Sequence, residues 1–168
     1  MTVDETCVTL QPECIRTFAP RGQTPVIRTP ARRTRIQAII GITPAGELAY
    51  RMQTRSFRGS DCAGFLAHLL RRFPGDILVV WDRLAAHRST AVKELLARQD
   101  RLTVEYLPAY CPDLNPEEWI NKAIKRDYKR NRVLKRLAEL RLMLRNALEA
   151  LRHRTKKIIR CFASANWF

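Results

Sequence analysis

The apolar run ILVVW at residues 77–81 constrains the fold more than any other stretch of the chain. It follows the helix-stopping pair Pro74 and Gly75 and ends at Asp82. A short, continuous apolar run of this kind is typical of a strand buried on both faces, which occurs in sheets that carry helices on both sides. The sequence therefore predicts an α/β fold in which residues 77–81 form a central strand.

The segments on either side of this run predict the rest of the sheet. Residues 1–58 favour three strands with hairpin links, because TVDETCVTL and ARRTRIQAIIGIT are rich in β-branched residues and PAGE is a turn signal before LAYRMQT. Downstream, the spacing of apolar residues predicts a helix over 60–73, a helix over 88–99, a strand over 101–107 and helical structure over 117–152. Hairpins followed by strand and helix alternation indicate a mixed five-stranded sheet flanked by helices.

Length and composition limit the class of protein. A chain of 168 residues fits one domain, so we expect residues 1–168 to form a single domain. No apolar run approaches the roughly 20 residues that span a bilayer, and the N-terminus lacks the features of a secretory signal. We therefore expect a cytoplasmic protein without a membrane partner. Five scattered cysteines without a C-x-x-C pair argue against a disulfide framework and a thiolate zinc site.

Charge gives the strongest compositional signal. The chain has 31 Lys and Arg against 16 Asp and Glu, a net charge of +15, and residues 122–160 hold 15 of these cations but only three acids. Such a segment favours a polyanion because binding releases condensed counterions, so a phosphate backbone is the expected partner. A solvated basic helix face is the alternative explanation, since charge alone is a weak functional signal.

Two acids are placed where a sheet commonly binds ligands. Asp82 stands at the carboxyl end of the predicted central strand, and Asp4 lies within the first extended segment. If these two strands pair, the carboxylates face each other and repel. A magnesium ion, which requires oxygen ligands, removes this conflict and recruits phosphate oxygens. Two divalent ions about 3.5 to 4 Å apart would stabilise both the attacking and the leaving oxygen of a phosphodiester cleavage.

The segment LPAYCPDLNPEEW at residues 107–119 supplies a third acid. Its three prolines restrict the backbone, so the loop has few conformations to lose when it packs. Asn115 is suited to cap a helix whose first turn contains Glu117 and Glu118, where acids interact favourably with the helix dipole. Capping alone would explain both acids without any catalytic role. We expect Trp119 to pack against this first turn rather than to stack on a base.

Four motifs together resemble a known family. The set VDET, APRGQTP, VVWDRLAAHRS and LPAYCPDLNPEEW is similar to the catalytic domain of the mariner superfamily of DDE transposases, in its bacterial insertion-sequence branch. The most specific element is L-P-x-Y-x-P-x-L-N-P-x-E, which ends at Glu118. The resemblance covers nearly the whole chain and implies an RNase H-like fold, DNA cleavage at transposon ends, and attack of the freed 3′-hydroxyl on target DNA.

The resemblance also implies roles for particular residues. It gives Asp4, Asp82 and Glu118 as the catalytic acids, holding two magnesium or manganese ions, with 35 residues between the last two acids. Glu117 stays as an alternative to Glu118. His87 would lie near the metals, where it orients a ligand or contacts phosphate; the alternative is a helix-capping or packing role. Residues proposed to contact DNA are Arg21, Arg28, Arg32, Arg33, Lys122 and Lys125.

Partners follow from the same resemblance. Full-length members carry helix-turn-helix domains before the catalytic part, and none precedes Asp4, so we expect either a separately encoded helix-turn-helix half or a catalytically inactive DNA-binding remnant. Transposases of this kind generally work as dimers on paired DNA ends, which implies a homodimer associated with the nucleoid. An RNA-cutting nuclease of the same fold would use the same acids, but the LNP signature argues against it.

Overall fold

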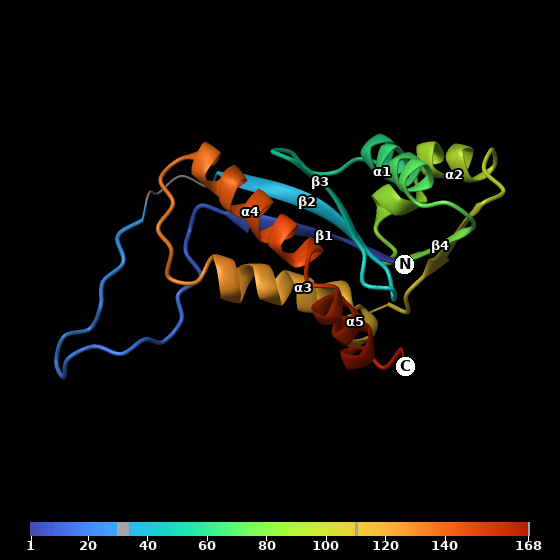
Figure 1. Ribbon diagram of the computed structural model, residues 1–168. Coiled ribbons are helices and arrows are strands. Elements are labelled where there is room, and N and C mark those ends of the chain that lie inside the picture. The colour runs from blue at the N-terminus through green and yellow to red at the C-terminus, as the bar shows by residue number, and fades with distance from the viewer. Residues whose placement is uncertain (30–33, 110, 168) are drawn as a thin grey trace.

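The computed structural model describes residues 1–29, 34–109 and 111–167 of the chain. Its centre is a five-stranded mixed sheet in the order β3-β2-β1-β4-β5 (Figure 1). β1 (Thr2–Thr9), β2 (Arg35–Ile42) and β3 (Leu48–Gln53) form an antiparallel meander, and β4 (Ile77–Trp81) and β5 (Leu102–Tyr106) continue the sheet in parallel with β1. The predicted α/β fold with a mixed five-stranded sheet is confirmed.

Helices cover the two faces of the sheet as two separate layers. On one side lie α1 (Gly59–Arg72), the short 3₁₀ helix η1 (Ala85–Arg88) and α2 (Thr90–Leu96); on the other lie α3 (Glu117–Ala123), α4 (Leu137–Arg152) and α5 (Thr155–Ser164) (Figure 1). Each layer has its own apolar core. Alternation along β2 divides the strand between them, with Ile39 in the α1 layer and Ile40 in the α4 layer.

The strand β4 differs from its prediction. Ile77, Val79 and Trp81 are buried against the α1 layer, but Leu78 on the opposite face is 49% exposed. The reason is that α3 and α4 pack over the antiparallel half of the sheet, β1 to β3, and leave this face of β4 largely uncovered. A continuous apolar run does not distinguish a strand covered on both faces from one covered on one face.

The helical structure predicted over 117–152 is interrupted. α3 passes into a π-helical turn, η3 (Ile124–Tyr128), and α4 begins only at Leu137. Asn131, with φ of 48°, lies in the left-handed region between them, and its side chain accepts a hydrogen bond from the amide of Ile15 at 3.0 Å. The connection is therefore held by the segment after β1. No helix among the described residues is long and apolar enough to cross a membrane.

Candidate active site

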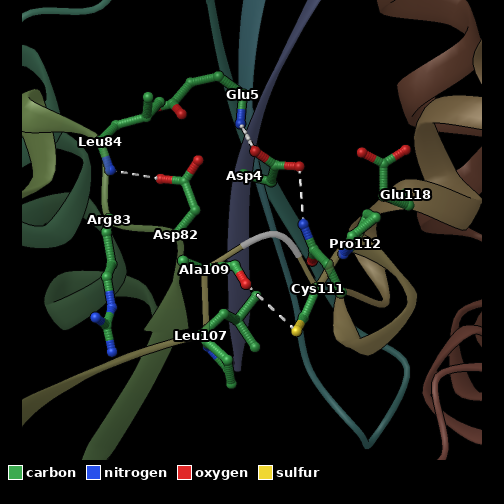
Figure 2. A pocket seen from close by; sticks show the side chains of 12 residues that line it. Asp4, Glu5, Asp82, Arg83, Leu84, Leu107, Ala109, Cys111, Pro112 and Glu118 are labelled. Atoms are coloured by element: carbon green, nitrogen blue, oxygen red, sulfur yellow. Dashed lines mark hydrogen bonds between the residues drawn. The ribbon is translucent and has the colours of Figure 1, made fainter.

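Three carboxylates from three different elements line one hollow in the protein surface, together with Glu5, the neighbour of the first. Asp4 comes from β1, Asp82 directly follows β4, and Glu118 is the second residue of α3. The hollow has a volume of about 620 Å³. In Figure 2, Asp4 lies between the other two acids, and the loop residues Leu107, Ala109, Cys111 and Pro112 also line the hollow. The structure thus brings together all three acids that the sequence indicated.

The sheet itself sets the first two acids side by side. β1 and β4 are parallel neighbours in which Thr2 pairs with Val80, so two residues further along each strand Asp4 stands beside Asp82. Met1 reinforces this register, because its carbonyl oxygen accepts a hydrogen bond from the amide of Val80 at 2.9 Å. Both carboxylates therefore meet beside the carboxyl end of β4, where ligands usually bind in such sheets.

The third acid is positioned through Asn115. This side chain is buried; its Nδ2 donates to Asp4 Oδ2 at 2.9 Å, and its Oδ1 accepts from the amide of Glu117 at 3.2 Å. One amide group therefore caps the start of α3 and holds the first acid at the same time. The preceding turn, η2 (Pro112–Leu114), fixes the approach of the loop. The expectation that Asn115 caps this helix is confirmed.

Asp4 is an acid of the cluster whose ionisation is disfavoured. The pKa of Asp4 is raised to about 7, first because burial disfavours the carboxylate and then because Glu5, Asp82 and Glu118 place negative charge nearby. The amide of Glu5 opposes this shift by donating a hydrogen bond to Asp4 Oδ1 at 2.7 Å. A divalent cation relieves this condition, since it allows all three acids to ionise. The donors are hard carboxylate oxygens, the ligand type that magnesium and manganese prefer, so the residues present fit such ions.

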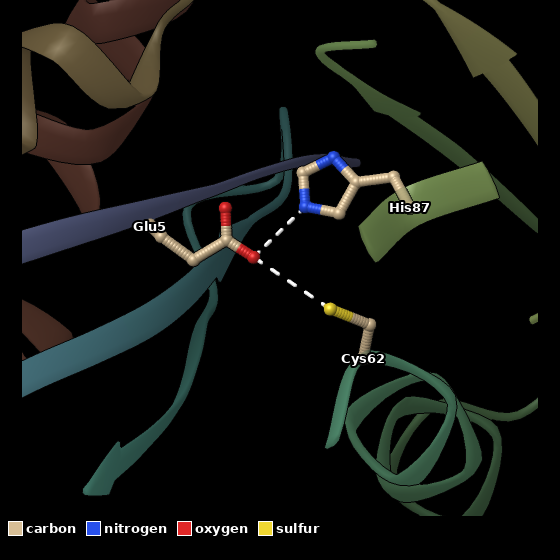
Figure 3. Close-up of side chains that lie close together, drawn as sticks. All are labelled: Glu5, Cys62 and His87. Carbon is tan, nitrogen blue, oxygen red and sulfur yellow. Dashed lines mark hydrogen bonds and ion pairs between the residues drawn. The ribbon is translucent and has the colours of Figure 1, made fainter. Parts of the chain in front are cut away.

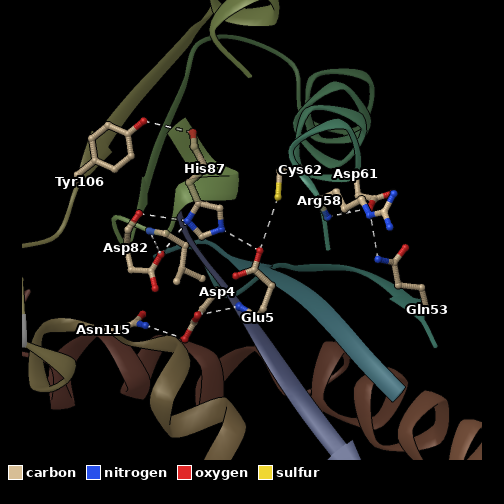
Figure 4. Close-up of polar contacts among 11 residues, drawn as sticks. Asp4, Glu5, Gln53, Arg58, Asp61, Cys62, Asp82, His87, Tyr106 and Asn115 are labelled. Atoms are coloured by element: carbon tan, nitrogen blue, oxygen red, sulfur yellow. Dashed lines mark hydrogen bonds and ion pairs between the residues drawn. The ribbon is translucent and has the colours of Figure 1, made fainter. Parts of the chain in front are cut away.

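His87 connects Asp82 to Glu5. It is fully buried, and its ring stacks on Trp81 with centroids 4.0 Å apart. Its Nδ1 lies 2.7 Å from Asp82 Oδ1, and its Nε2 lies 2.8 Å from Glu5 Oε1 (Figure 4). The structure thus places His87 in direct contact with an acid of the hollow.

This contact explains the protonation of the pair. Burial opposes a charge on His87, but hydrogen bonds to Asp82, Cys62 and Glu5 outweigh it and raise the pKa of His87 to about 12. Burial would likewise raise the pKa of Asp82, but hydrogen bonds from His87 and the amide of Leu84 lower it below its usual value. His87 is therefore an imidazolium that keeps Asp82 ionised and fixes its orientation.

Glu5 and Cys62 are two members of this network that sequence reasoning missed. The thiol of Cys62, on α1, lies 3.8 Å from Glu5 Oε1 (Figure 3). Alternation along β1 directs Glu5 to the face opposite Asp4, toward α1 and His87. The VDET motif contained the necessary signal, because neighbouring acids on one strand must face different layers.

Glu117 and Glu118 occupy different environments although they are adjacent. Glu118 lines the hollow, whereas Glu117 is 1% exposed and does not line it. Burial and the charge of Asp4 raise the pKa of Glu117 well above its usual value, and the amide of Ile42 offsets this only partly. Its two oxygens have no partner within ordinary hydrogen-bond limits among the described residues. Burial therefore favours the protonated form of Glu117.

The basic residues expected to contact DNA divide into three groups. Lys122 lines a second hollow that adjoins the acids, and Lys125 is exposed on η3. Arg21 and Arg28 are exposed on the long excursion that leaves the far end of β1 (Figure 1), so the structure does not bring them to the acids. Arg32 and Arg33 lie outside the described residues.

Trp119 is not a packing residue of the first turn of α3. Its side chain is 43% exposed, and the ammonium of Lys122 lies 4.6 Å from the centroid of its ring. The helix buries Ile120 and Asn121 instead, because these positions face the sheet. The expectation that Trp119 packs against the core is therefore wrong.

The sheet order, the helices on both faces and the acids at the parallel edge are those of an RNase H-like protein. Residues 1–141 match the family model described as DDE superfamily endonuclease, and the chain belongs to this family. No curated protein matches the chain at a significant level.

Solved structures support the same fold. The chain is similar to the Mos1 mariner paired-end complex with Mn (17% identity, TM-score 0.77, covering 99% of this chain and 52% of that one). It is also similar to the Mos1 transposase paired-end complex with left transposon end (17% identity, TM-score 0.70, 98% and 54%). A third match is the catalytic domain of Mos1 mariner transposase (14% identity, TM-score 0.61, 98% and 80%). The chain spans about half the length of the first two proteins.

Proposed function

We propose that this chain is the catalytic domain of a DNA transposase of the bacterial insertion-sequence branch of the mariner superfamily. In this role it cuts DNA strands and joins the freed 3′-hydroxyl to target DNA. The observation that carries the proposal is the convergence of Asp4, Asp82 and Glu118 on one hollow, in a chain of the DDE endonuclease family. The similar Mos1 structures, whose names include a left transposon end, Mn and Mg, are consistent with it.

In this proposal the three acids hold two magnesium or manganese ions. When bound, such ions stabilise the attacking and the leaving oxygen of a phosphodiester displacement. Asp82 contributes as a carboxylate that His87 keeps ionised and oriented. Asn115 orients Asp4 and the first turn of α3 together, so that Asp4 and Glu118 face the same hollow. His87 and Asn115 thus act as positioning residues.

The partners belong to the same proposal. Transposon ends and target DNA are the substrates, residues 1–168 act as one catalytic domain, and a separately encoded helix-turn-helix half recognises the ends. A homodimer brings two ends together at the nucleoid. The net charge of +15 supports a polyanionic partner, since each phosphate contact releases counterions.

A plasmid-nicking assay tests the proposal. We expect the purified chain to nick supercoiled plasmid with Mg²⁺ or Mn²⁺, and we expect Asp82→Asn to reduce nicking by about 100-fold or more, because it removes a charged metal ligand. The matched control is Asp76→Asn, an exposed acid just before the opposite end of β4, which should nick like wild type. Equal nicking by wild type and Asp82→Asn would contradict the assignment.

The nicking assay, together with DNA-binding measurements, distinguishes the proposed enzyme from an inactive DNA-binding remnant. A remnant would bind DNA with a steep salt dependence but would nick with neither metal. The Asp82→Asn variant would then bind metal and DNA as wild type does. Metal-dependent nicking by wild type excludes this alternative.

A further inference from the structure

A groove leads away from the three acids along α3 and α5. A second hollow, of about 600 Å³, shares Pro112 and Glu118 with the acid hollow and is also lined by Trp119 and Lys122. A third, of about 150 Å³, shares Trp119 with the second and reaches Arg160 on α5. Each hollow adjoins the next through shared lining residues, and we call the second and third hollows together the Trp119 groove.

Trp119 is partly exposed and lines both hollows of this groove. The indole is 43% exposed, and Lys122 occupies a position 4.6 Å from its centroid, which steadies the ring through a cation–π contact. A single exposed apolar residue would mean little by itself. Here the exposed ring directly follows an acid of the candidate active site and lies in a groove that leaves it.

The charges of the groove favour phosphate. Lys122 and Arg160 form no ion pair with a carboxylate among the residues that the structure describes, whereas the neighbouring Lys157 is bound to Asp127 at 2.7 Å. The acids of the groove are Glu118, which the proposed metal ions would neutralise, and Asp113. Two cations that have no carboxylate partner among the described residues thus line the groove with this partly exposed ring.

We infer that the Trp119 groove binds an unpaired stretch of DNA strand, with one base stacked on Trp119 and the backbone contacting Lys122 and Arg160. The inference rests on the proposed function, which supplies DNA at the acids. An aromatic platform between cations is the arrangement by which proteins bind single strands without reading sequence. A duplex does not fit this role, because stacked neighbours cover the faces of its bases.

Equilibrium binding in Ca²⁺, an oxygen-binding cation that neutralises the acids in place of Mg²⁺, tests the inference on probes verified to be intact after the measurement. The probes are a labelled single strand of about 12 nucleotides and a blunt duplex of equal length. We expect Trp119→Leu to weaken single-strand binding by about tenfold, the effect of losing one stacked base. Duplex binding should change by less than about twofold, and Trp119→Phe should retain most of the single-strand affinity because it keeps a ring. A 2-aminopurine base in the strand should be quenched by wild type and not by Trp119→Leu.

The cations give a second, independent readout. The double variant Lys122→Ala/Arg160→Ala should reduce the slope of log affinity against log salt by about 1.4, since each lost phosphate contact on a single strand accounts for about 0.7. The control Lys93→Ala removes an exposed lysine on α2, in the opposite helix layer, and should leave the single-strand affinity and the salt slope unchanged. Thermal melting of each variant verifies that the fold is retained.

The outcomes separate this inference from the proposed function. If wild type nicks plasmid but Trp119→Leu binds single strands as tightly as wild type, the groove assignment is wrong and the proposed function stands. If wild type never nicks with metal, the proposed function fails, whereas a Trp119-dependent quench would still support strand binding in the groove. Equal loss of single-strand and duplex binding in Trp119→Leu would overturn the stacking role.

Discussion

Two neighbouring glutamates at the start of α3 show how strongly one residue of rotation changes the chemistry of a carboxyl group. Glu118 faces the hollow with Asp4 and Asp82, whereas Glu117 faces the interior beside the amide of Ile42. Successive helix positions differ by about 100°, so these two adjacent side chains point in different directions. A helix start that presents one acid to a metal site therefore directs its neighbour into the core.

Substitutions at these two positions should separate catalysis from stability. Glu118→Gln should reduce nicking by about 100-fold or more, because a neutral amide is a poor ligand for magnesium. Glu117→Gln should keep nicking within about tenfold of wild type, because the amide has the shape of the protonated acid and does not line the hollow. A nicking assay at matched protein concentration measures both effects, and a reversed pattern would show that Glu117 is the active acid.

The same pair also gives a pH dependence of stability with a definite sign. The folded-state pKa of Glu117 is raised above its unfolded value, so its contribution is fully present at low pH and is lost as the pH rises through the folded pKa. Glu117→Gln cannot ionise at this position. Its free energy of unfolding should therefore increase relative to that of wild type as the pH rises, by at most about 1.4 kcal/mol per pH unit. Urea unfolding of both proteins across neutral pH measures the difference.

Sequence reasoning located the acids of the site but not the residues that support them. Asp82 and Glu118 stand at element ends, where strand and helix patterns are visible along the chain, and Asp4 follows from strand pairing. The contact of His87 with Glu5 joins residues 82 positions apart, and that of Asn115 with Asp4 joins residues 111 apart. Such contacts depend on the pairing of β1 with β4 and on the path of the loop, which local periodicity does not specify.

At the scale of elements, the turn between β2 and β3 shows how the sheet meets the last helix. Gly46, with φ of 87°, closes this turn and packs directly against Thr155, the first residue of α5. A Cβ atom at Gly46 would lie 2.4 Å from Thr155 Cγ2 and 2.8 Å from its carbonyl oxygen. The turn therefore requires glycine for both its backbone conformation and its contact with α5.

Alanine substitution should separate these two requirements. Gly75 has a similar φ of 78° but nothing within 4 Å of the added Cβ, so Gly75→Ala should show only the backbone penalty of about 1–2 kcal/mol. Gly46→Ala should cost about 1–3 kcal/mol more, because the added methyl group forces α5 away from the turn. Urea unfolding midpoints at a shared slope measure both losses, and equal losses would show that the contact with Thr155 is not tight.

Element boundaries were harder to predict in the C-terminal third than in the sheet. The strands of the sheet were identified because β-branched residues and turn signals define them locally. The break between η3 and α4 contains no glycine or proline, and the apolar stripe continues through Leu134, which is buried in the connection rather than in a helix. It is contacts of Lys129 and Asn131 with the segment after β1 that end the helix, and these are tertiary.

At the scale of the whole molecule, a chain of net charge +15 concentrates acids at one edge of its sheet. The positive surface attracts a polyanion, but a phosphate cannot approach three carboxylates unless cations neutralise them. The basic helices therefore attract the polyanion, whereas the acids can take part in a reaction at a phosphate only when metal is bound. Metal binding and stability should be coupled through Asp4, because its pKa is raised to about 7 in the absence of metal.

The stability of the metal-free protein should fall as the pH rises through neutrality. The folded pKa of Asp4 is raised to about 7, so its contribution is complete near its ordinary, lower pKa and is lost as the pH passes about 7. In EDTA, the melting temperature of wild type should therefore fall relative to that of Asp4→Asn between about pH 6 and about pH 8.

At the higher pH, Mn²⁺ at about 100 times its dissociation constant should raise the wild-type Tm by roughly 5–10 °C, because it binds the folded state alone. The rise should be smaller at the lower pH, where protons compete for the ligands, and absent in Asp4→Asn. Differential scanning fluorimetry measures all four conditions, and an equal metal shift in Asp4→Asn would show that the ions bind without this acid.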